Sequence, residues 1–460
     1  MNRWTAAFAF AASALAMDAH ALDGDADPAF GDNGQVAITR PPNIGGNGTK
    51  PTGDLLQRDD GRYLWAAPLD DGSVWVGRAF RNGAPDATFG GFGNGRVTLP
   101  ACGASRNVRL ADDGAEGAVV WAGSCLVRLD VDGHVVDGFG DGATLPPAGF
   151  SAAGFARDAQ GRYVLAGKAG ATELRVHRYA ADGADDATFG TLGSTVVVVP
   201  STNGFADLYA LAVRGDGRIL VGGDRGNTHG PNMVLVQLNE DGTPDPGWDG
   251  DGIVDLEPPD GYDRLYATAL AIDADGSLVV SGMSSDGGVS CCLMLARFDT
   301  SGQLVPSFGL RIFRLSTQPA LFPFFEQRDG LALLPNGRIV MGAISFPFAA
   351  PFTHRTQYTL VRTFADGSLD AGFGHDGWNS YTIADPVGVG QTGDYVQMHA
   401  IAYDRIDDSL VMLGRTFFED GSTGDDYVTF VRARFDLVFA DAFDRGGGAV
   451  PAVTGDIGSR

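Results

Sequence analysis

The chain has 460 residues, of which 44% are hydrophobic, and its 57 acidic against 33 basic residues give a net charge of −24 at pH 7. Such an acidic surface repels phosphate backbones, which argues against nucleic acid as a partner. No apolar run is long enough to cross a bilayer, so we expect no membrane span.

The first 21 residues have the three parts of an export signal. Arg3 supplies the positive end, and residues 5–17 form a short apolar core. Ala19-His-Ala21 has the small-x-small pattern of a cleavage site. We therefore expect cleavage after Ala21, which gives a signal peptide over residues 1–21 and a secreted or periplasmic protein.

A short phrase, Asp-x-x-Phe-Gly or a near equivalent, returns along the rest of the chain. Its copies are Asp27-Pro-Ala-Phe30-Gly31, Asp86-Ala-Thr-Phe89-Gly90, Asp137-Gly-Phe139-Gly140, Asp186-Ala-Thr-Phe189-Gly190, Asp245-Pro-Gly-Trp248-Asp249, Val305-Pro-Ser-Phe308-Gly309 and Asp370-Ala-Gly-Phe373-Gly374. A degenerate eighth copy is Asp441-Ala-Phe443. Successive aromatic residues lie 50 to 70 positions apart, so eight marks bound seven units. A period of this size indicates an array of supersecondary units.

Each unit contains the signature of a β-hairpin. In the clearest copy, two apolar runs at 208–213 and 219–223 flank the dipeptide Asp216-Gly217. We expect the glycine to have the positive φ that a type I′ turn requires. The same turn is expected at Gly61, Gly161, Gly276, Gly337 and Asp408, and at either Gly114 or Gly117 in the second unit.

A small residue stands six positions past each turn, counted from Gly117 in the second unit. These residues are Ala67, Gly123, Gly167, Gly223, Gly282, Ala343 and Gly414. Because glycine weakens the interior of a strand, this pattern predicts that another backbone or blade approaches closely there. A third strand follows, and a fourth comes after the Phe-Gly corner, as in Gly34–Thr39.

Seven units of four short strands predict an all-β fold. Each repeat has roughly 60 residues, and radial repetition of four-stranded sheets is how a β-propeller protects its strand edges. We therefore predict a seven-bladed β-propeller over residues 22–444. The closing segment, residues 445–460, lacks apolar periodicity and is expected to be a disordered C-terminal tail.

The pattern resembles the delta-60 repeat family of bacterial proteins, whose unit pairs an Asp-Gly-Lys/Arg hairpin with Arg-Tyr-x-x-Asp-Gly-x-x-Asp-x-x-Phe-Gly. The closest copies are residues 178–190 and 297–309. Three corners depart from it, because Asp137-Gly-Phe139 lacks a spacer, Trp248 replaces Phe and Val305 replaces Asp. The resemblance covers nearly all of the chain after residue 22. It implies an exported, propeller-like protein and supplies no catalytic residues.

Four cysteines are present, and an exported protein can hold disulfides. Cys102 and Cys125 lie within one unit and flank its hairpin, so we expect them to form a disulfide. Cys291 and Cys292 are adjacent, and neighbours rarely bridge because the resulting ring is strained. Two free or intermolecular thiols are therefore favoured over a vicinal disulfide, and no arrangement resembles a zinc site.

Three patterns resemble chemical sites, but their context argues against each. Gly388-Val-Gly-Gln-Thr-Gly393 matches the dinucleotide fingerprint, yet no helix follows it. Ser151 lacks the spacing of a nucleophile elbow. The acidic turns Asp23/Asp25/Asp27 and Asp245/Asp249/Asp251 lack the spacing of a calcium loop. We therefore expect no cofactor and no metal, and we nominate no catalytic residue.

The strongest departure from symmetry is aromatic and lies in the sixth unit. Phe322, Phe324 and Phe325 precede its hairpin, and Phe346, Phe348 and Phe352 follow it. Intervening prolines put part of this material in loops. Exposed aromatic side chains there would form a contact surface, and the alternative is that they pack on one another and cap the blade.

Two functions remain open at this point. We favour a monomeric, exported binding or structural module that is not an enzyme and that contacts a protein or a glycan through the Phe residues. The alternative is an extracellular or periplasmic hydrolase or lyase with a site at the central channel. A cluster of charged residues that do not repeat from unit to unit would favour the enzyme, if it lay around the axis.

Overall fold

The computed structural model describes residues 23–40, 53–100, 102, 107–123, 125–141, 143, 145–146, 150–202, 206–227, 230–287, 289–314, 321–324, 330–347, 356–384, 395–418 and 425–435. These residues form 28 strands and no helix, and so none that could cross a membrane. The expected signal peptide and tail lie outside the described residues.

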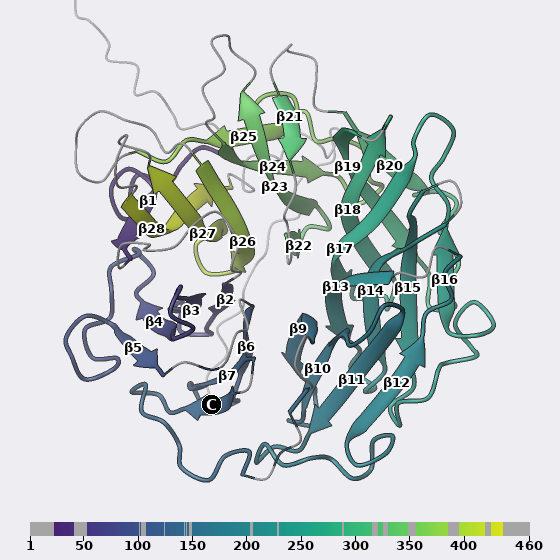
Figure 1. Cartoon of the computed structure of the whole chain (residues 1–460). Coiled ribbons are helices and arrows are strands. Elements are labelled where there is room, and N and C mark those ends of the chain that lie inside the picture. The colour runs from purple at the N-terminus through teal and green to yellow at the C-terminus, as the bar shows by residue number, and fades with distance from the viewer. Residues whose placement is uncertain are drawn as a thin grey trace, which may run out of the picture.

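The strands form seven antiparallel sheets, the blades, arranged in a ring (Figure 1). The innermost strands of blades 1 to 7 are β2 (Asp54–Gln57), β6 (Val108–Asp112), β9 (Ser151–Arg157), β13 (Ala206–Val213), β17 (Arg264–Ile272), β22 (Leu331–Leu333) and β26 (Tyr395–Asp404). The second strands are β3 (Tyr63–Pro68), β7 (Ala118–Ala122), β10 (Tyr163–Lys168), β14 (Ile219–Arg225), β18 (Leu278–Asp286), β23 (Ile339–Pro347) and β27 (Ser409–Phe418). The prediction of a seven-bladed, all-β propeller is confirmed.

The outer half of each blade follows the same order. The third strands are β4 (Val74–Ala79), β8 (Cys125–Leu129), β11 (Glu173–Tyr179), β15 (Asn232–Leu238), β19 (Val289–Phe298), β24 (Gln357–Thr363) and β28 (Asp425–Arg434). The fourth strands are β5 (Arg96–Leu99), β12 (Ser194–Val198), β16 (Ile253–Leu256), β20 (Leu310–Phe313), β25 (Trp378–Tyr381) and, in blade 7, β1 (Gln35–Thr39). Blade 2 has three strands among the described residues, and in blade 6 both β22 and β21 (Leu321–Phe324) pair with β23.

The two ends of the chain build blade 7 together. Strand β1 pairs antiparallel with β28, with Gln35 opposite Val431 and Thr39 opposite Tyr427. The segment before β1 supplies the turn at Asp23-Gly24 and the corner from Asp27 to Gly31. The seven corners of the ring are therefore the first seven copies of the repeated phrase, and the degenerate copy at 441–443 lies outside the described residues.

The apolar core is divided among the blade interfaces. Seven clusters of buried side chains are formed by the described residues, one between each pair of neighbouring blades. Between blades 7 and 1, for example, Trp65 packs against Phe430 with ring centroids 5.9 Å apart, and the corner ring of Phe30 is 1% exposed. Each blade is thus stabilised mainly by contact with its two neighbours.

The hairpin turns differ from the predicted type I′. Gly217 has φ +87°, but its neighbours Gly215 and Asp216 do not have positive φ. A type I′ turn needs two such residues, whereas a turn followed by one left-handed glycine needs only one. The Gly217 amide donates to the Arg214 carbonyl at 2.9 Å, which closes the turn in this second way. In blade 2 the residue that takes the place of Gly217 in the turn is Glu116, which has φ +66°. Of the two glycines considered for this turn, Gly114 has positive φ and Gly117 does not.

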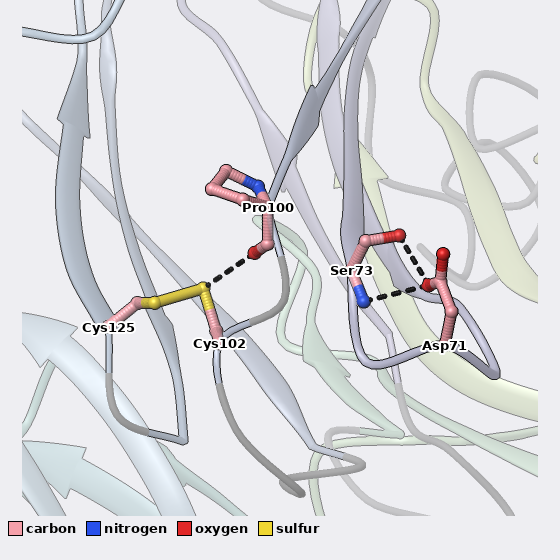
Figure 2. Close-up of a disulfide and its surroundings, with 5 residues drawn as sticks. All are labelled: Asp71, Ser73, Pro100, Cys102 and Cys125. Carbon is pink, nitrogen blue, oxygen red and sulfur yellow. Dashed lines mark hydrogen bonds between the residues drawn. A yellow bond between two sulfur atoms is a disulfide. The ribbon is translucent and has the colours of Figure 1, made fainter.

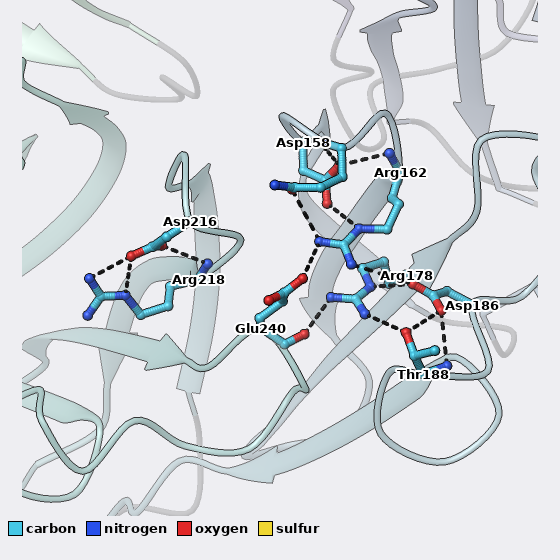
Figure 3. Close-up of polar contacts among 9 residues, drawn as sticks. Asp158, Arg162, Arg178, Asp186, Thr188, Asp216, Arg218 and Glu240 are labelled. Carbon is cyan, nitrogen blue, oxygen red and sulfur yellow. Dashed lines mark hydrogen bonds and ion pairs between the residues drawn. The ribbon is translucent and has the colours of Figure 1, made fainter.

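The corners join each blade to the next one on the face that carries these hairpin turns, which we call the turn face (Figure 3). Nε of Arg178 donates to Asp186 at 2.7 Å, and the guanidinium lies 4.6 Å from the ring centre of Phe189. Another nitrogen of Arg178 donates to the Glu240 carbonyl of the following blade. Equivalent Arg–Asp pairs are Arg78–Asp86, Arg362–Asp370 and Arg432–Asp27.

We call each corner, with its contacts to the next blade, a joint. A backbone hydrogen bond between the two blades accompanies most of the joints. The residue after the corner aromatic donates to a turn carbonyl in the next blade at 2.8 to 2.9 Å; the pairs are Gly31–Asn82, Gly90–Asp132, Gly140–Asp182, Gly190–Asp241, Asp249–Ser301 and Gly374–Asp23. At the joint of blades 5 and 6, Gly309 instead donates to Val305 within its own corner, at 2.7 Å. This is the corner in which valine replaces the repeated aspartate.

The disulfide predicted between Cys102 and Cys125 is confirmed, with their Cα atoms 5.2 Å apart (Figure 2). It links the segment that connects blade 1 to blade 2 covalently to the first residue of β8. The Cys102 amide also donates to the Gly72 carbonyl of blade 1 at 3.1 Å. Cys292 is disulfide-bonded as well and is buried, so the expectation of a free thiol is wrong for this residue. The side chain of Cys291 lies outside the described part of the chain.

Candidate functional site

In four blades the periodic small residue faces a bulge in the innermost strand. In blade 4, Leu208 pairs with Gly223 and Ala210 with Gly222, which leaves Tyr209 as an extra residue. A Cβ atom on Gly223 would lie 1.9 Å from the Asp207 carbonyl oxygen, so the predicted close approach of another backbone is confirmed. Bulges of this kind turn a side chain out of the regular register.

The same bulge recurs around the ring. The extra residue is Ala153 in blade 3, Thr268 in blade 5 and His399 in blade 7. We call Ala153, Tyr209, Thr268 and His399 the bulge ring. The backbone feature is repeated while the side chains differ, so these positions are candidates for asymmetric function.

The most unusual carboxyl group of the described residues follows the small residue of blade 4. Asp224 is 1% exposed, and burial raises its pKa to about 7; the nearby charge of Asp207 adds to this rise, and a hydrogen bond from Tyr209 opposes it. Oδ1 of Asp224 has no hydrogen-bond partner among the described residues. At neutral pH this carboxyl can therefore both donate and accept a hydrogen bond.

Other polar groups surround Asp224 and reach the solvent. Lys168 of blade 3 pairs with Asp207 at 2.5 Å, and their side chains are 26% and 42% exposed. In blade 5, a guanidinium nitrogen of Arg264 lies 3.4 Å from the hydroxyl of Tyr266. The charge of Arg264 opposes the rise in the pKa of Asp224, and the charge of Asp224 helps to raise the pKa of Tyr266. We call Lys168, Asp207, Tyr209, Asp224, Arg264 and Tyr266 the polar cluster. It joins a buried acid to an open rim of donors and acceptors.

The polar cluster does not repeat. The residue after the periodic small position is Pro68, Lys168, Asp224, Met283, Ile344 and Arg415 in blades 1, 3, 4, 5, 6 and 7. Three of these are charged, and two of the charged ones stand in neighbouring blades. Our sequence reasoning missed Asp224, although a charge at a buried strand position beside the small residue was a visible signal.

Two open pockets lie on the turn face. One, of about 580 Å³, is lined by joint and turn residues including Arg178, Asp216 and Glu240. The other, of about 700 Å³, lies among the hairpin turns of blades 1 to 3 and includes Arg58, Asp112 and Arg157. Their side chains already pair with one another, as Arg58 does with Asp112 at 2.9 Å, so we regard them as structural.

The predicted aromatic contact surface is only partly visible. The backbones of β21 and β23 pair Phe322 with Phe346, at the end of β23 away from the turn face. The side chains of Phe322, Phe324 and Phe346 and the whole of Phe325, Phe348 and Phe352 lie outside the described part, so this surface stays a prediction.

The structure also accounts for the acidic turns. Asp23 pairs with Arg362, and Asp27 with Arg432 at 2.5 Å. Asp245 accepts hydrogen bonds from Gln237 at 2.7 Å and from the Gly247 amide at 2.9 Å. Within the described ranges no three His, Cys, Asp or Glu side chains are grouped as metal ligands. Residues 388–393, with the dinucleotide-like pattern, lie outside those ranges.

Comparison with known proteins gives one family match. Residues 214–247, the stretch of blade 4 from its hairpin turn to its corner, match a domain of unknown function, DUF5122, described as a beta-propeller. This is a small part of the chain, so membership of the family is not established. No curated protein matches the chain.

Several solved structures are similar at low scores. Sqt1 from Chaetomium thermophilum is 15% identical with a TM-score of 0.41, over 82% of this chain and 81% of that one. The WD40 domain of Toxoplasma gondii coronin is 10% identical with a TM-score of 0.39, over 89% and 88%. A putative gluconolactonase is 13% identical with a TM-score of 0.31, over 70% and 87%. At these scores none of them carries an argument about function.

Proposed function

We propose that this protein is an exported binding module for a hydroxyl-rich ligand, a glycan, which it holds at the polar cluster. The observation that carries the proposal is Asp224. It is a buried carboxyl group with an unpartnered oxygen, in a strand position that is apolar in blades 1, 5 and 6. A buried polar group without a partner costs stability, and a ligand hydroxyl would supply the missing partner.

The chemistry around Asp224 supports a sugar as the ligand. Carboxylate, ammonium, guanidinium and phenol groups alternate within the cluster, and hydroxyl groups need both donors and acceptors. The direction of the strands supports a further contribution from Phe346, and the sequence pattern adds Phe322, Phe324, Phe325, Phe348 and Phe352 as its neighbours along the chain. Strands β14 and β23 both run away from the turn face, so Asp224 and Phe346 belong to the same opposite face. Aromatic side chains there would cover the apolar face of a sugar ring.

A glycan array tests the proposal with the mature chain from Leu22 and three variants. Asp224→Asn and Tyr209→Phe should weaken binding at least tenfold, because each removes a polar group from the cluster. The triple change of Phe346, Phe348 and Phe352 to Ser tests the aromatic contribution. Asp216→Asn, in an exposed turn on the other face, is the matched control and should bind like the parent. Equal binding by all variants would reject both surfaces.

A glycoside hydrolase is the second candidate, and the pKa of Asp224 is the observation that favours it. A carboxyl group that titrates near pH 7 can act as a general acid, and Asp207 supplies a second carboxylate in the same cluster. Incubation of any bound glycan with the protein separates the two functions. Release of reducing ends that Asp224→Asn abolishes, while binding persists, would establish an enzyme; no release would leave a binding module.

Export, family and oligomeric state complete the proposal. The N-terminal pattern supports cleavage after Ala21, and the repeated hairpin and corner support membership of the delta-60 repeat family. The numerous acidic turns suit a monomer outside the cell. Mass spectrometry of the processed chain should find Leu22 as its first residue, and light scattering should give the mass of one chain. An unprocessed N-terminus would reject export by this signal.

A further inference from the structure

The polar cluster borders a second polar surface, on blade 5. Arg264, a member of the cluster, is the first residue of β17, the inner strand of that blade. The next amide, that of Leu265, donates to the Pro231 carbonyl of blade 4 at 3.0 Å. Pro231 stands two residues before Met233, which pairs directly with Asp224 across the strands. Backbone contacts therefore hold the start of blade 5 beside the buried acid.

Three elements of blade 5 meet next to the start of β17. The Asp263 amide donates to the Ser285 carbonyl at 3.0 Å, and the Ser285 hydroxyl donates to Asp263 at 2.5 Å. These bonds hold the end of β18 against the start of β17. Asp286, the last residue of β18, pairs at 2.7 Å with Arg314, which follows β20. The guanidinium carbon of Arg314 lies 6.0 Å from the centre of the Tyr262 ring.

We call Tyr262, Asp286 and Arg314 the outer group. The side chains of Asp286 and Arg314 are each 49% exposed, and Tyr262 is partly buried, so the outer group is open to solvent. Strand β17 begins and β18 and β20 end at the face opposite the turn face, which is also the face of Asp224. From β17 to β20 the blade extends outward over three strand spacings, about 14 Å (Figure 1).

The cation of the outer group does not repeat. A glycine directly precedes each described fourth strand, and the blades can be compared at the fifth residue after it. This residue is Pro100, Val198, Glu257, Arg314, Thr382 and Thr39 in blades 1, 3, 4, 5, 6 and 7. Of these six blades, blade 5 alone has a cation there. A residue that held the blades together would recur, as the Arg–Asp pairs of the turn face do, so this position suits an asymmetric role.

The formal charges of the two groups are balanced. Lys168 pairs with Asp207 at 2.5 Å, and Arg314 pairs with Asp286 at 2.7 Å. A site for a charged sugar needs a surplus of the opposite charge. Paired charges instead present donors and acceptors side by side, which is what the hydroxyl groups of an uncharged sugar need.

We infer that the ligand of the polar cluster is a neutral oligosaccharide, and that a unit further along its chain binds at the outer group. The inference rests on the proposed function, because it assigns the length and the charge of the same ligand. One sugar ring is too short to span about 14 Å, so two units contact the two groups. Tyr262 supplies an aromatic ring to the second unit, and Asp286 and Arg314 supply an acceptor and donors to its hydroxyl groups.

Calorimetry with neutral oligosaccharides of one to six units tests the inference. The probes are homopolymer series of glucose, mannose, galactose and xylose. In a series that binds, affinity should rise at least tenfold between one and four units and then level off, because four units reach both groups. Tyr262→Ala should remove most of this rise. An affinity that does not depend on length would overturn the inference.

Three further variants locate the effect. Asp224→Asn should weaken one unit and four units alike. Phe92→Ala removes an aromatic ring of blade 1 that is 85% exposed, and as the matched control it should bind like the parent. If Tyr262→Ala does not fold, Arg314→Ala changes an exposed side chain and should weaken four units at least threefold more than one unit. An equal loss at both lengths would overturn the outer group.

Oligomers of galacturonate, at the same lengths, test the charge of the ligand. They should bind at least tenfold more weakly than the neutral series, and tighter binding would overturn the neutral class. The two proposals also fail in different ways. If no probe binds the parent at any length, the proposed function falls and this inference falls with it. If Asp224→Asn abolishes binding that neither length nor Tyr262→Ala affects, the inference alone is overturned.

Discussion

The turn face and the bulge ring differ in how closely their side chains repeat from blade to blade. At the turn face four of the seven joints use the same set, which is an Arg–Asp pair, a buried Phe ring and an amide donated to the next blade. In the bulge ring the backbone geometry recurs, but the side chains are Ala153, Tyr209, Thr268 and His399. Positions that hold blades together are thus kept alike, while positions beside the axis are free to differ.

The largest effect should come from breaking a joint. Arg362 is 1% exposed and binds Asp370, Asp23 and the ring of Phe373. Arg362→Ala removes a buried cation that binds two carboxylates, of which Asp370 keeps Arg338 at 2.8 Å, so it should lower the free energy of unfolding by about 3–5 kcal/mol in denaturant titrations. The control is Arg314→Ala, whose pair with Asp286 is half exposed and should contribute less than about 1 kcal/mol. Equal effects would show that the joints are not what stabilises the ring.

The polar cluster should show the reverse behaviour, because a group placed for function is costly for stability. The folded-state pKa of Asp224 is raised, so folding binds a proton that the unfolded chain has lost, and stability falls as pH rises from about 4 to 7. Asp224→Asn removes this penalty. It should stabilise the protein by up to about 4 kcal/mol at pH 8 and by little at pH 4, since one pKa unit is worth about 1.4 kcal/mol.

Unfolding of both proteins by urea at the two pH values measures this difference. The control Asp182→Asn alters an exposed turn, and should change the unfolding free energy by less than about 0.5 kcal/mol at either pH. A gain for Asp224→Asn that is the same at pH 4 and pH 8 would contradict the raised pKa.

The disulfide between Cys102 and Cys125 tests whether blade 2 needs a covalent support. Cys102 and Cys125 close a loop across 23 positions, next to a blade with three described strands. Replacing both by Ser should lower the free energy of unfolding by about 3 kcal/mol, because the unfolded chain is then no longer constrained by the closed loop. Calorimetry of the double variant, compared with the oxidised parent, measures this loss. A loss well below 1 kcal/mol would mean that the noncovalent contacts of blade 2 suffice.

The smallest effect concerns the hairpin turn of blade 2. Glu116 has φ +66°, a conformation that glycine adopts in most of the other blades. Glu116→Gly should therefore stabilise the protein by about 1 kcal/mol, visible as a small rise in Tm. Gly61→Glu in blade 1 is the reciprocal change and should destabilise by a similar or larger amount. Destabilisation by Glu116→Gly would show that the Glu116 side chain has a role of its own.

The fold was predictable because its determinants repeat. The corner phrase gave the number of blades, and the periodic small residues marked the close backbone approach. The turn type was misjudged, since a sequence shows the glycine but not whether the residue before it also has positive φ. The closure of the ring was hidden because the corner before β1 is a copy of the same repeated phrase as the other corners, and nothing in it marks the end of the ring.

The candidate site was harder to foresee. Tyr209, Asp224 and His399 come from strands whose spacing looks regular. Tyr209 and His399 are the extra residues of bulges, and the bulges depend on the pairing of first and second strands. The aromatic residues of the sixth unit attracted attention by composition alone, and their side chains lie outside the described residues. Nothing in the spacing of Asp224 reveals that its carboxyl group is buried without a full set of partners.

The pairing of β1 with β28 gives the chain an order of events. Arg40 and Asp426, which bind each other across this closure, are 386 positions apart. Of the described strands, β1 is made first and its partner β28 last, so β1 is the last of them to find its partner. Until then the early blades can stack on one another, but the circle stays open at one edge. Completion of synthesis, and not the folding of any single blade, is what turns a row of sheets into a ring.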